Sequence, residues 1–238
     1  MSKHFFSDLG VMLGRSMRHI TRSMDTIITV CLTPIAVLLL FVYVLGGAIQ
    51  TGTDNYVNYL LPGVLLMAIA SGIFERFHSM PITRSAALWG HVLTSLISNA
   101  ISVVVIILVA LVIGFRSPAG VLSWLAVAGI LALVILALTW IAVIPGLTAK
   151  SVDGASAFSY PLIFLPFISS AFVPTESMPG PVRAFAENQP VTSIVDAIRA
   201  LLSNQPVGND IWIALAWCVG ILIVAYVFAM LIYKRKAA

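Results

Sequence analysis

The chain has 238 residues, of which 60% are hydrophobic and only 9% are charged, and its mean hydropathy is +1.05. Soluble domains carry roughly 25% charged residues, so this composition excludes a soluble fold and indicates an integral membrane protein. The net charge of +4 comes from Lys and Arg beside apolar segments, without a basic patch interleaved with aromatic residues, which argues against a nucleic-acid partner.

The first predicted element is an amphipathic helix in residues 1–25. Its apolar side chains recur at helical spacing, and its basic side chains lie off that stripe or beside it. The apolar set is Phe6, Leu9, Leu13, Met17 and Ile20, and the basic set is Lys3, Arg15, Arg18 and Arg22. The pattern favours an interfacial helix in the headgroup layer; the alternative is a cytoplasmic tail helix packed on protein. No cleavable signal peptide is expected, because its long apolar stretch is missing.

Intervals without charged residues or histidine predict six transmembrane helices. A span needs about 20 apolar residues, and lipid offers no hydrogen-bond partner to a non-helical backbone. The helices are predicted at about 26–50, 56–74, 92–115, 119–149, 154–173 and 210–233. The expected fold is therefore an all-α polytopic membrane protein, with the interfacial helix before the first span and a short extracytoplasmic helical hairpin before the last.

The second predicted span is short. Its clearly apolar part, 59–74, has 16 residues and reaches only about 24 Å. The helix must therefore thin the bilayer, borrow residues 55–58, or stop short of the inner surface.

A charged segment, 75–91, follows the second span and is the largest predicted cytoplasmic element between helices. It contains Glu75, Arg76, Phe77, His78, Ser79, Met80, Pro81 and Arg84. One interpretation is a plain inner loop. The other is a docking element for a soluble partner, in which aromatic and arginine side chains are favoured anchors.

Polar residues are rare in the predicted spans. The inner half of the third span carries Ser95, Ser98, Asn99 and Ser102, which indicate helix–helix contact or, alternatively, the lining of a substrate path. No ionisable residue lies in the central turns of any span, which argues against an ion-coupled secondary carrier.

The outer segment, 174–209, contains a short amphipathic helix at 190–202. Its apolar face is Ile194, Val195, Ile198, Leu201 and Leu202. Asp196 and Arg199 share the other face at i, i+3, and Thr192 or Ser193 is the expected N-terminal cap. This helix would lie on the outer bilayer surface or dip back into it.

The distribution of Lys and Arg predicts the orientation. With a cytoplasmic N-terminus, ten of the thirteen lie on the inner side and three, at positions 116, 183 and 199, on the outer side. The positive-inside rule therefore places both termini in the cytoplasm.

Catalytic and cofactor motifs are missing. No two histidines have the i, i+4 spacing of a metal site, and no G-x-x-x-x-G-K or G-x-S-x-G motif occurs. Cys31 and Cys218 fall in apolar segments and are expected to pack as small hydrophobes. We therefore expect no enzyme activity, catalytic residue, metal or cofactor, and any transport would need an energising partner.

Several stretches resemble the ABC-2 type export permeases, in the branch of daunorubicin- and multidrug-resistance permeases. The most specific is "GIFERFHSMPITRSAALWGHVL" at 72–93, and the others are "YVNYLLPGVLLM" at 56–67, the outer segment at 173–202 and the basic tail "YKRKAA" at 233–238. The resemblance covers essentially the whole chain as a single transmembrane domain, 1–238.

The resemblance implies a permease subunit that exports an amphipathic drug-like or lipid-like substrate across the bacterial inner membrane. It implies a homodimer in the lipid bilayer with two copies of a separate ATP-binding subunit, and it implies that the segment around Glu75–Pro81 meets that subunit. One departure is a shorter junction between "LLPGVLLM" and "FERFHSMP" than in the family. A coupling-defective permease or a membrane scaffold protein is therefore the alternative function.

Overall fold

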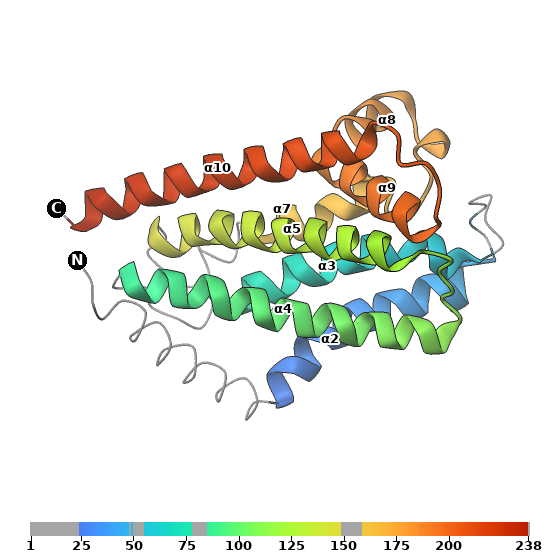
Figure 1. Cartoon of the computed structure of the whole chain (residues 1–238), viewed down its shortest axis with the longest axis horizontal. Helices are drawn as coiled ribbons and strands as arrows, with labels where there is room; N and C mark the ends of the chain where they lie inside the picture. Colours follow the sequence, from blue (N-terminus) through green and yellow to red (C-terminus); the bar gives the residue numbers. More distant parts are fainter. Residues whose placement is uncertain (1–23, 48, 50–54, 78–84, 149–158, 238) are drawn as a thin grey trace.

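The computed structural model describes residues 24–47, 49, 55–77, 85–148 and 159–237, and within them the chain forms helices and no strand (Figure 1). The long elements are α2 (Met24–Leu39), α3 (Tyr56–Phe77), α4 (Ser85–Ile113), α5 (Val121–Thr148) and α10 (Asp210–Ala237). The short ones are the π-helical turn η1 (Leu40–Leu45), α7 (Ser159–Phe164), the 3₁₀ turns η2 (Leu165–Ile168) and η3 (Thr175–Ser177), α8 (Gly180–Glu187) and α9 (Pro190–Leu202). The all-helical class expected from the sequence is confirmed.

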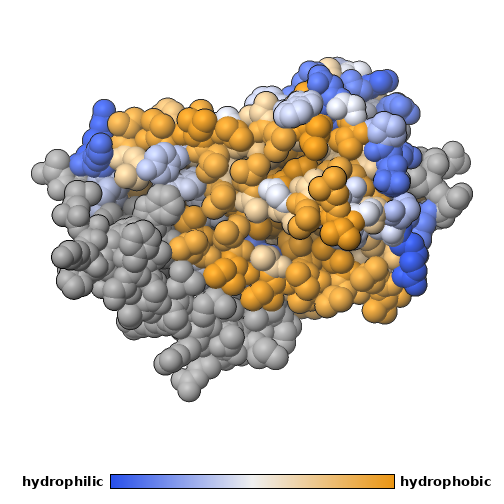
Figure 2. Space-filling view, in the orientation of Figure 1, coloured by the Kyte–Doolittle hydropathy of each residue, from blue (hydrophilic) through white to orange (hydrophobic). Residues whose placement is uncertain are grey.

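Four of these helices are long and apolar enough to cross a membrane. They contain the segments Tyr56–Ile73, Val92–Ile113, Val121–Thr148 and Asp210–Arg235, and a shorter apolar helix covers Cys31–Leu45. Figure 2 shows a broad hydrophobic band across the molecule, with hydrophilic residues gathered toward its two ends. The chain is therefore a multi-pass membrane protein, and the count of six spans stays a prediction.

Helix α3 forms the centre of the bundle. The membrane-spanning window in α3 is 83% buried, whereas that in α10 is only 17% buried. Leu60, Leu61, Val64 and Ile73 are fully enclosed, because α2, α4, α5 and α9 all pack on α3. Helix α10 packs mainly on α5 and α9 and leaves its other side for lipid or another chain.

The second predicted span reaches sufficient length by extending at both ends. Helix α3 begins at Tyr56, where the Asn55 side chain accepts a hydrogen bond from the Val57 amide (3.2 Å), and it continues through Phe77. Its 22 residues are about 33 Å long at 1.5 Å per residue. Of the three options, the helix therefore borrows residues that precede its apolar part.

The charged segment 75–91 is not a single loop. Residues 75–77 form the last turn of α3, and α4 begins at Ser85, seven residues before the predicted start at 92. Residues 78–84 lie outside the described part of the chain. The apolar membrane-spanning segment of α4 still begins at Val92, and the helix starts before it because "SAALW" is free of glycine and proline.

The structure departs further from the prediction at the fifth span, 154–173. Helix α7 ends at Phe164, nine residues before the predicted end, and the chain turns through η2 and residues 169–172. Pro166 has no amide hydrogen to donate, which ends the α-helical bonding. The Ser169 hydroxyl then donates to the Pro166 carbonyl (2.6 Å) and accepts from the Ala171 amide (3.1 Å), so serine side chains complete the turn. Residues 154–158 lie outside the described part.

Helix α9 has the predicted bounds, and its whole predicted apolar face is buried against α3, α5 and α10. It packs on protein and not only on the bilayer surface. The predicted cap was wrong: Gln189 is the N-cap and makes no side-chain cap bond. Pro190 at the first helical position has no amide hydrogen to satisfy, and Thr192 bonds elsewhere.

Candidate functional site

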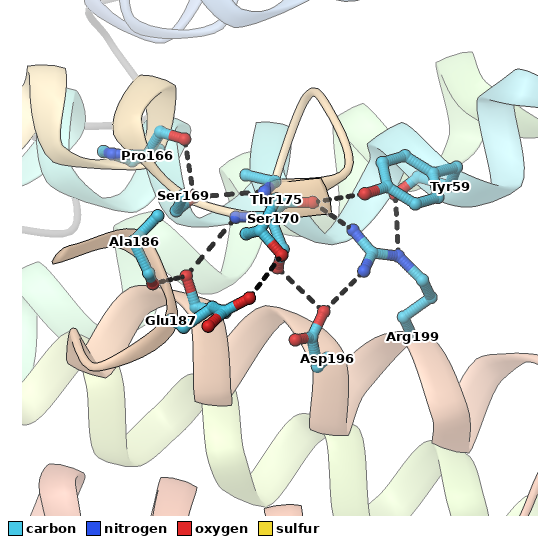
Figure 3. Close-up of polar contacts among 11 residues, drawn as sticks. Tyr59, Pro166, Ser169, Ser170, Thr175, Ala186, Glu187, Asp196 and Arg199 are labelled. Carbon is cyan, nitrogen blue, oxygen red and sulfur yellow. Dashed lines mark hydrogen bonds and ion pairs between the residues drawn. The ribbon is translucent and has the colours of Figure 1, made fainter. Parts of the chain in front are cut away.

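A buried polar network joins α3, the turn at 169–172 and α9 (Figure 3). Ser170 is at its centre. The Ser170 carbonyl accepts hydrogen bonds from the Tyr59 hydroxyl (2.9 Å) and from Nη2 of Arg199 (2.7 Å). The Ser170 hydroxyl donates to Oδ1 of Asp196 (2.8 Å), and its amide donates to the Thr192 hydroxyl (3.3 Å). We call Tyr59, Ser170, Thr192, Asp196 and Arg199 the α9 network.

Arg199 binds three partners at once. Its guanidinium carbon lies 3.7 Å from the centre of the Tyr59 ring, a cation–π geometry, and its Nε donates to the Tyr59 carbonyl (3.3 Å). Nη1 lies 2.5 Å from Oδ1 of Asp196. A planar guanidinium is suited to such divergent bonding, whereas lysine would supply only a point charge.

Asp196 is the acidic member of the α9 network. Burial raises the pKa of its carboxyl group above the ordinary value, and the neighbouring charge of Arg199 and the Ser170 hydrogen bond only partly oppose this. Burial therefore favours the protonated carboxyl, and the Arg199 pair is what favours the ionised one.

The turn approaches α3 closely because of one glycine. A Cβ atom at Gly63 would lie 2.6 Å from the Cβ of Ala171, so no larger residue fits there without movement. The Tyr56 hydroxyl donates to the Phe172 carbonyl (2.8 Å) one turn before Tyr59. Tyr56, Tyr59 and Gly63 thus form one face of α3 at i, i+3 and i+7, on which the turn rests.

Two further contacts hold the hairpin formed by α8 and α9: one within the hairpin and one to the residue before the turn. The Thr192 hydroxyl donates to the Ala186 carbonyl of α8 (2.5 Å), and the Gln189 side-chain amide donates to the Ile168 carbonyl. The network therefore links three segments into one unit. Among the described residues no group of three His, Cys, Asp or Glu side chains could hold a metal ion.

One polar residue of α4, Ser95, bonds to α5, and the others bond within α4. The Ser95 hydroxyl is 3.2 Å from the Thr139 hydroxyl of α5, and Nδ2 of Asn99 donates to the Ser95 carbonyl (2.9 Å). The Ser102 hydroxyl donates to the Ser98 carbonyl (3.2 Å). All four predicted residues are buried, and the bond to Thr139 favours the helix-contact interpretation over a substrate path.

The predicted docking residues fall partly in the last turn of α3 and partly outside the described residues. Glu75, Arg76 and Phe77 form the last turn of α3, while His78, Ser79, Met80, Pro81 and Arg84 lie outside the described residues, as do residues 1–23 of the predicted interfacial helix. Figure 1 shows the end of α3, the start of α4 and the end of α10 at one end of the bundle, with α8 and α9 at the other. The charged segment and Asp196–Arg199 therefore belong to opposite ends.

Sequence reasoning found Asp196 and Arg199 but missed their partners. The missed partners are Tyr56, Tyr59, Gly63 and Ser170. Two patterns hinted at some of them: the two tyrosines stand at i, i+3 at the start of a span, and the pair Ser169–Ser170 interrupts an apolar segment. Buried tyrosine hydroxyls usually find a hydrogen-bond partner, but the sequence does not say which.

The comparisons with known proteins agree on one family. The model of the ABC-2 type transporter family matches residues 7–203. The chain is 27% identical over 245 aligned residues to the daunorubicin resistance ABC transporter permease protein DrrB1 of Streptomyces coeruleorubidus, covering 95% of this chain and 86% of that protein. It is 26% identical over 196 residues to the probable doxorubicin resistance ABC transporter permease protein DrrC of Mycobacterium tuberculosis strain H37Rv, covering 81% and 68%. The family match includes both the charged segment and the α9 network.

Proposed function

Because this chain belongs to the ABC-2 type transporter family, we propose that it is the transmembrane subunit of an ATP-driven exporter. The observation that carries the proposal is the family match over residues 7–203 of a chain with four apolar helices of membrane-spanning length. ATP would be hydrolysed by a separate ATP-binding subunit, since the sequence lacks a phosphate-binding G-x-x-x-x-G-K motif.

The substrate class is an amphipathic, drug-like or lipid-like molecule. Two relatives are named for resistance to daunorubicin and doxorubicin. The apolar character of the bundle supports a substrate that partitions into the membrane, because no ionisable residue lies in the predicted central turns to bind a small ion.

The working assembly is a homodimer with two copies of the ATP-binding subunit in the bacterial inner membrane. Six spans follow from the intervals without charged residues or histidine, and cytoplasmic termini follow from the bias of Lys and Arg toward one side. Under this topology α8, α9 and the α9 network lie on the outer side, and the charged segment between α3 and α4 lies inside.

Docking of the ATP-binding subunit takes place on Glu75–Arg84 and the adjoining helix ends. Helices α3 and α4 run from this segment into the core, so a movement there would be passed to the most buried helix of the bundle. The junction that is shorter than in the family leaves α3 at about 33 Å, long enough to span the hydrocarbon layer of about 30 Å. Folding therefore tolerates the shorter junction, and coupling is the step that it would weaken.

The test uses the full chain co-expressed with the ATP-binding subunit that co-purifies from native membranes. Arg76→Glu is expected to release that subunit and to abolish ATP-dependent daunorubicin efflux. Arg183→Glu is the matched control, because it makes the same charge change on exposed α8 at the other end of the bundle. Loss of efflux without loss of the subunit would place docking elsewhere. A chain that binds no ATP-binding subunit at all would favour the scaffold alternative.

A further inference from the structure

An apolar groove with a volume of about 680 Å³ runs along the seam between α5 and α10. Its walls include Ile141 and Ile144 of α5 and Trp217, Gly220, Val224 and Phe228 of α10. Trp217 is 41% exposed and Phe228 is 56% exposed, so the groove is open to the side of the bundle. It is separate from the α9 network and from the charged segment.

The sequence of α10 creates the hollow. Trp217, Gly220, Val224 and Phe228 recur at i, i+3, i+7 and i+11 and form one stripe. On the opposite face of α10, Tyr226 packs edge-on against Trp140 of α5 with ring centroids 4.8 Å apart and holds the helices together. At Gly220 a Cβ atom would meet no other atom within 4 Å, so the missing side chain leaves space in the wall.

The charges beside the groove identify what fills it. Lys234 and Arg235 are exposed on the last turns of α10, six residues beyond Phe228 or about 9 Å along the helix. No acidic residue occurs in 211–238 to neutralise them, and Figure 2 shows hydrophilic residues at this end of α10. The stripe begins at Phe228 and is about 16 Å long, so an acyl chain whose headgroup lies at Lys234 enters it at the Phe228 end.

We propose that the α5–α10 groove is a binding site for an anionic phospholipid, with an acyl chain along Trp217–Phe228 and the phosphate at Lys234 and Arg235. Basic residues just outside a span attract anionic headgroups, and their long side chains reach the interface. A second copy of the chain packed face to face here would bring two Lys–Arg pairs of like charge together, which disfavours it. The site does not depend on ATP or on the exported substrate.

The proposal is tested by native mass spectrometry of the delipidated chain, titrated with phosphatidylglycerol and, separately, phosphatidylcholine of the same acyl chains. We expect one phosphatidylglycerol per chain, bound at least tenfold more tightly than phosphatidylcholine. Gly220→Leu places a side chain in the groove, starting from a Cβ atom that meets no other atom within 4 Å, and should remove this binding. Gly129→Leu is the matched control, since a Cβ at Gly129 of α5 also meets no atom within 4 Å but lies outside the groove. It should bind like the wild type.

A second pair of variants tests the headgroup. Lys234→Gln with Arg235→Gln should reduce the preference for phosphatidylglycerol to less than threefold, whereas Arg183→Gln on α8 should leave it unchanged. Equal affinity for the two lipids in the wild type would overturn the proposal, as would Gly220→Leu binding that equals wild type. Disulfide formation between two copies of a Trp217→Cys variant would assign the groove to a second chain, and that too would overturn it.

Discussion

The guanidinium of Arg199 lies 3.7 Å from the centre of the Tyr59 ring, although 140 positions separate the two residues in sequence. The contact joins the most buried helix, α3, to the hairpin before α10. Through Ser170 the same two side chains also share one carbonyl acceptor on the intervening turn. The turn, the hairpin and α3 are therefore expected to move or unfold as one unit, and removal of Arg199 should release all three.

Arg199→Ala is expected to lower the free energy of unfolding by about 3 kcal/mol, because it leaves Asp196 without its cation and removes one donor each from the Tyr59 and Ser170 carbonyls. Arg199→Lys keeps the charge but not the fork of donors and should fall between the variant and the wild type. Denaturant titration in detergent micelles measures both. The control is Arg183→Ala, which removes an exposed ion pair with Glu187 and should leave the transition unchanged. Equal effects at positions 199 and 183 would mean that the α9 network contributes no more than a surface pair.

Gly63→Ala is expected to destabilise the protein by about 1–3 kcal/mol, because its methyl group would lie 2.6 Å from the Cβ of Ala171. Combining it with Ala171→Gly removes the closest contact, although the carbonyl oxygen and Cα of residue 171 still lie 3.0 and 3.1 Å from the new methyl group, and should recover part of the loss. Gly129→Ala is the control for helix propensity, since its methyl group meets open space; it should be neutral or slightly stabilising. The thermal midpoint of each variant in detergent is the measurement. Failure of the double variant to recover would show that the turn does not rest on Gly63.

The two interpretations of the polar residues on α4 predict different results for Thr139→Val. If Ser95 and Thr139 only connect α4 to α5, the variant loses about 0.6 kcal/mol of stability, and the efflux KM for daunorubicin does not change. A double-mutant cycle with Ser95→Ala isolates the pair. We expect this outcome because both side chains are buried. A several-fold change in KM at unchanged stability would instead assign these residues to a substrate path.

Sequence reasoning succeeded where local chemistry decides the structure. The bounds and buried face of α9 follow from Pro190 and from apolar residues at helical spacing, which need no knowledge of the rest of the fold. Sequence reasoning failed where residues far apart in the sequence determine the structure. The partners of Tyr59 and Arg199 are fixed by a turn 111 positions from Tyr59. The predicted N-cap of α9 was wrong for the same reason, since the Thr192 side chain bonds to Ser170 and Ala186 and not to the first turn of its own helix.

The raised pKa of the Asp196 carboxyl gives the stability a pH dependence of known sign. A folded-state pKa above the unfolded value, about 3.9, means that the folded chain binds the proton more tightly. The stabilisation that comes from the bound proton of Asp196 is therefore complete at a pH below the unfolded pKa. It is lost as the pH rises through the folded pKa. Asp196→Asn has no such proton, so the wild type should lose stability relative to this variant as the pH rises from 3.5 through that window. A wild type that gains stability relative to Asp196→Asn as the pH rises would mean that Arg199 outweighs burial.

The proposed topology predicts which residues reagents can reach from outside intact cells. In a background of Cys31→Ala and Cys218→Ala, Gln205→Cys lies in the exposed loop before α10 and should react with a membrane-impermeant maleimide. Ser79→Cys, in the charged segment that the proposed topology places in the cytoplasm, should react only after the cells are permeabilised. The two sites serve as controls for each other, because both are single cysteines in one background. Reaction of Ser79→Cys in intact cells, with protection of Gln205→Cys, would invert the topology, and the charged segment would then face away from ATP.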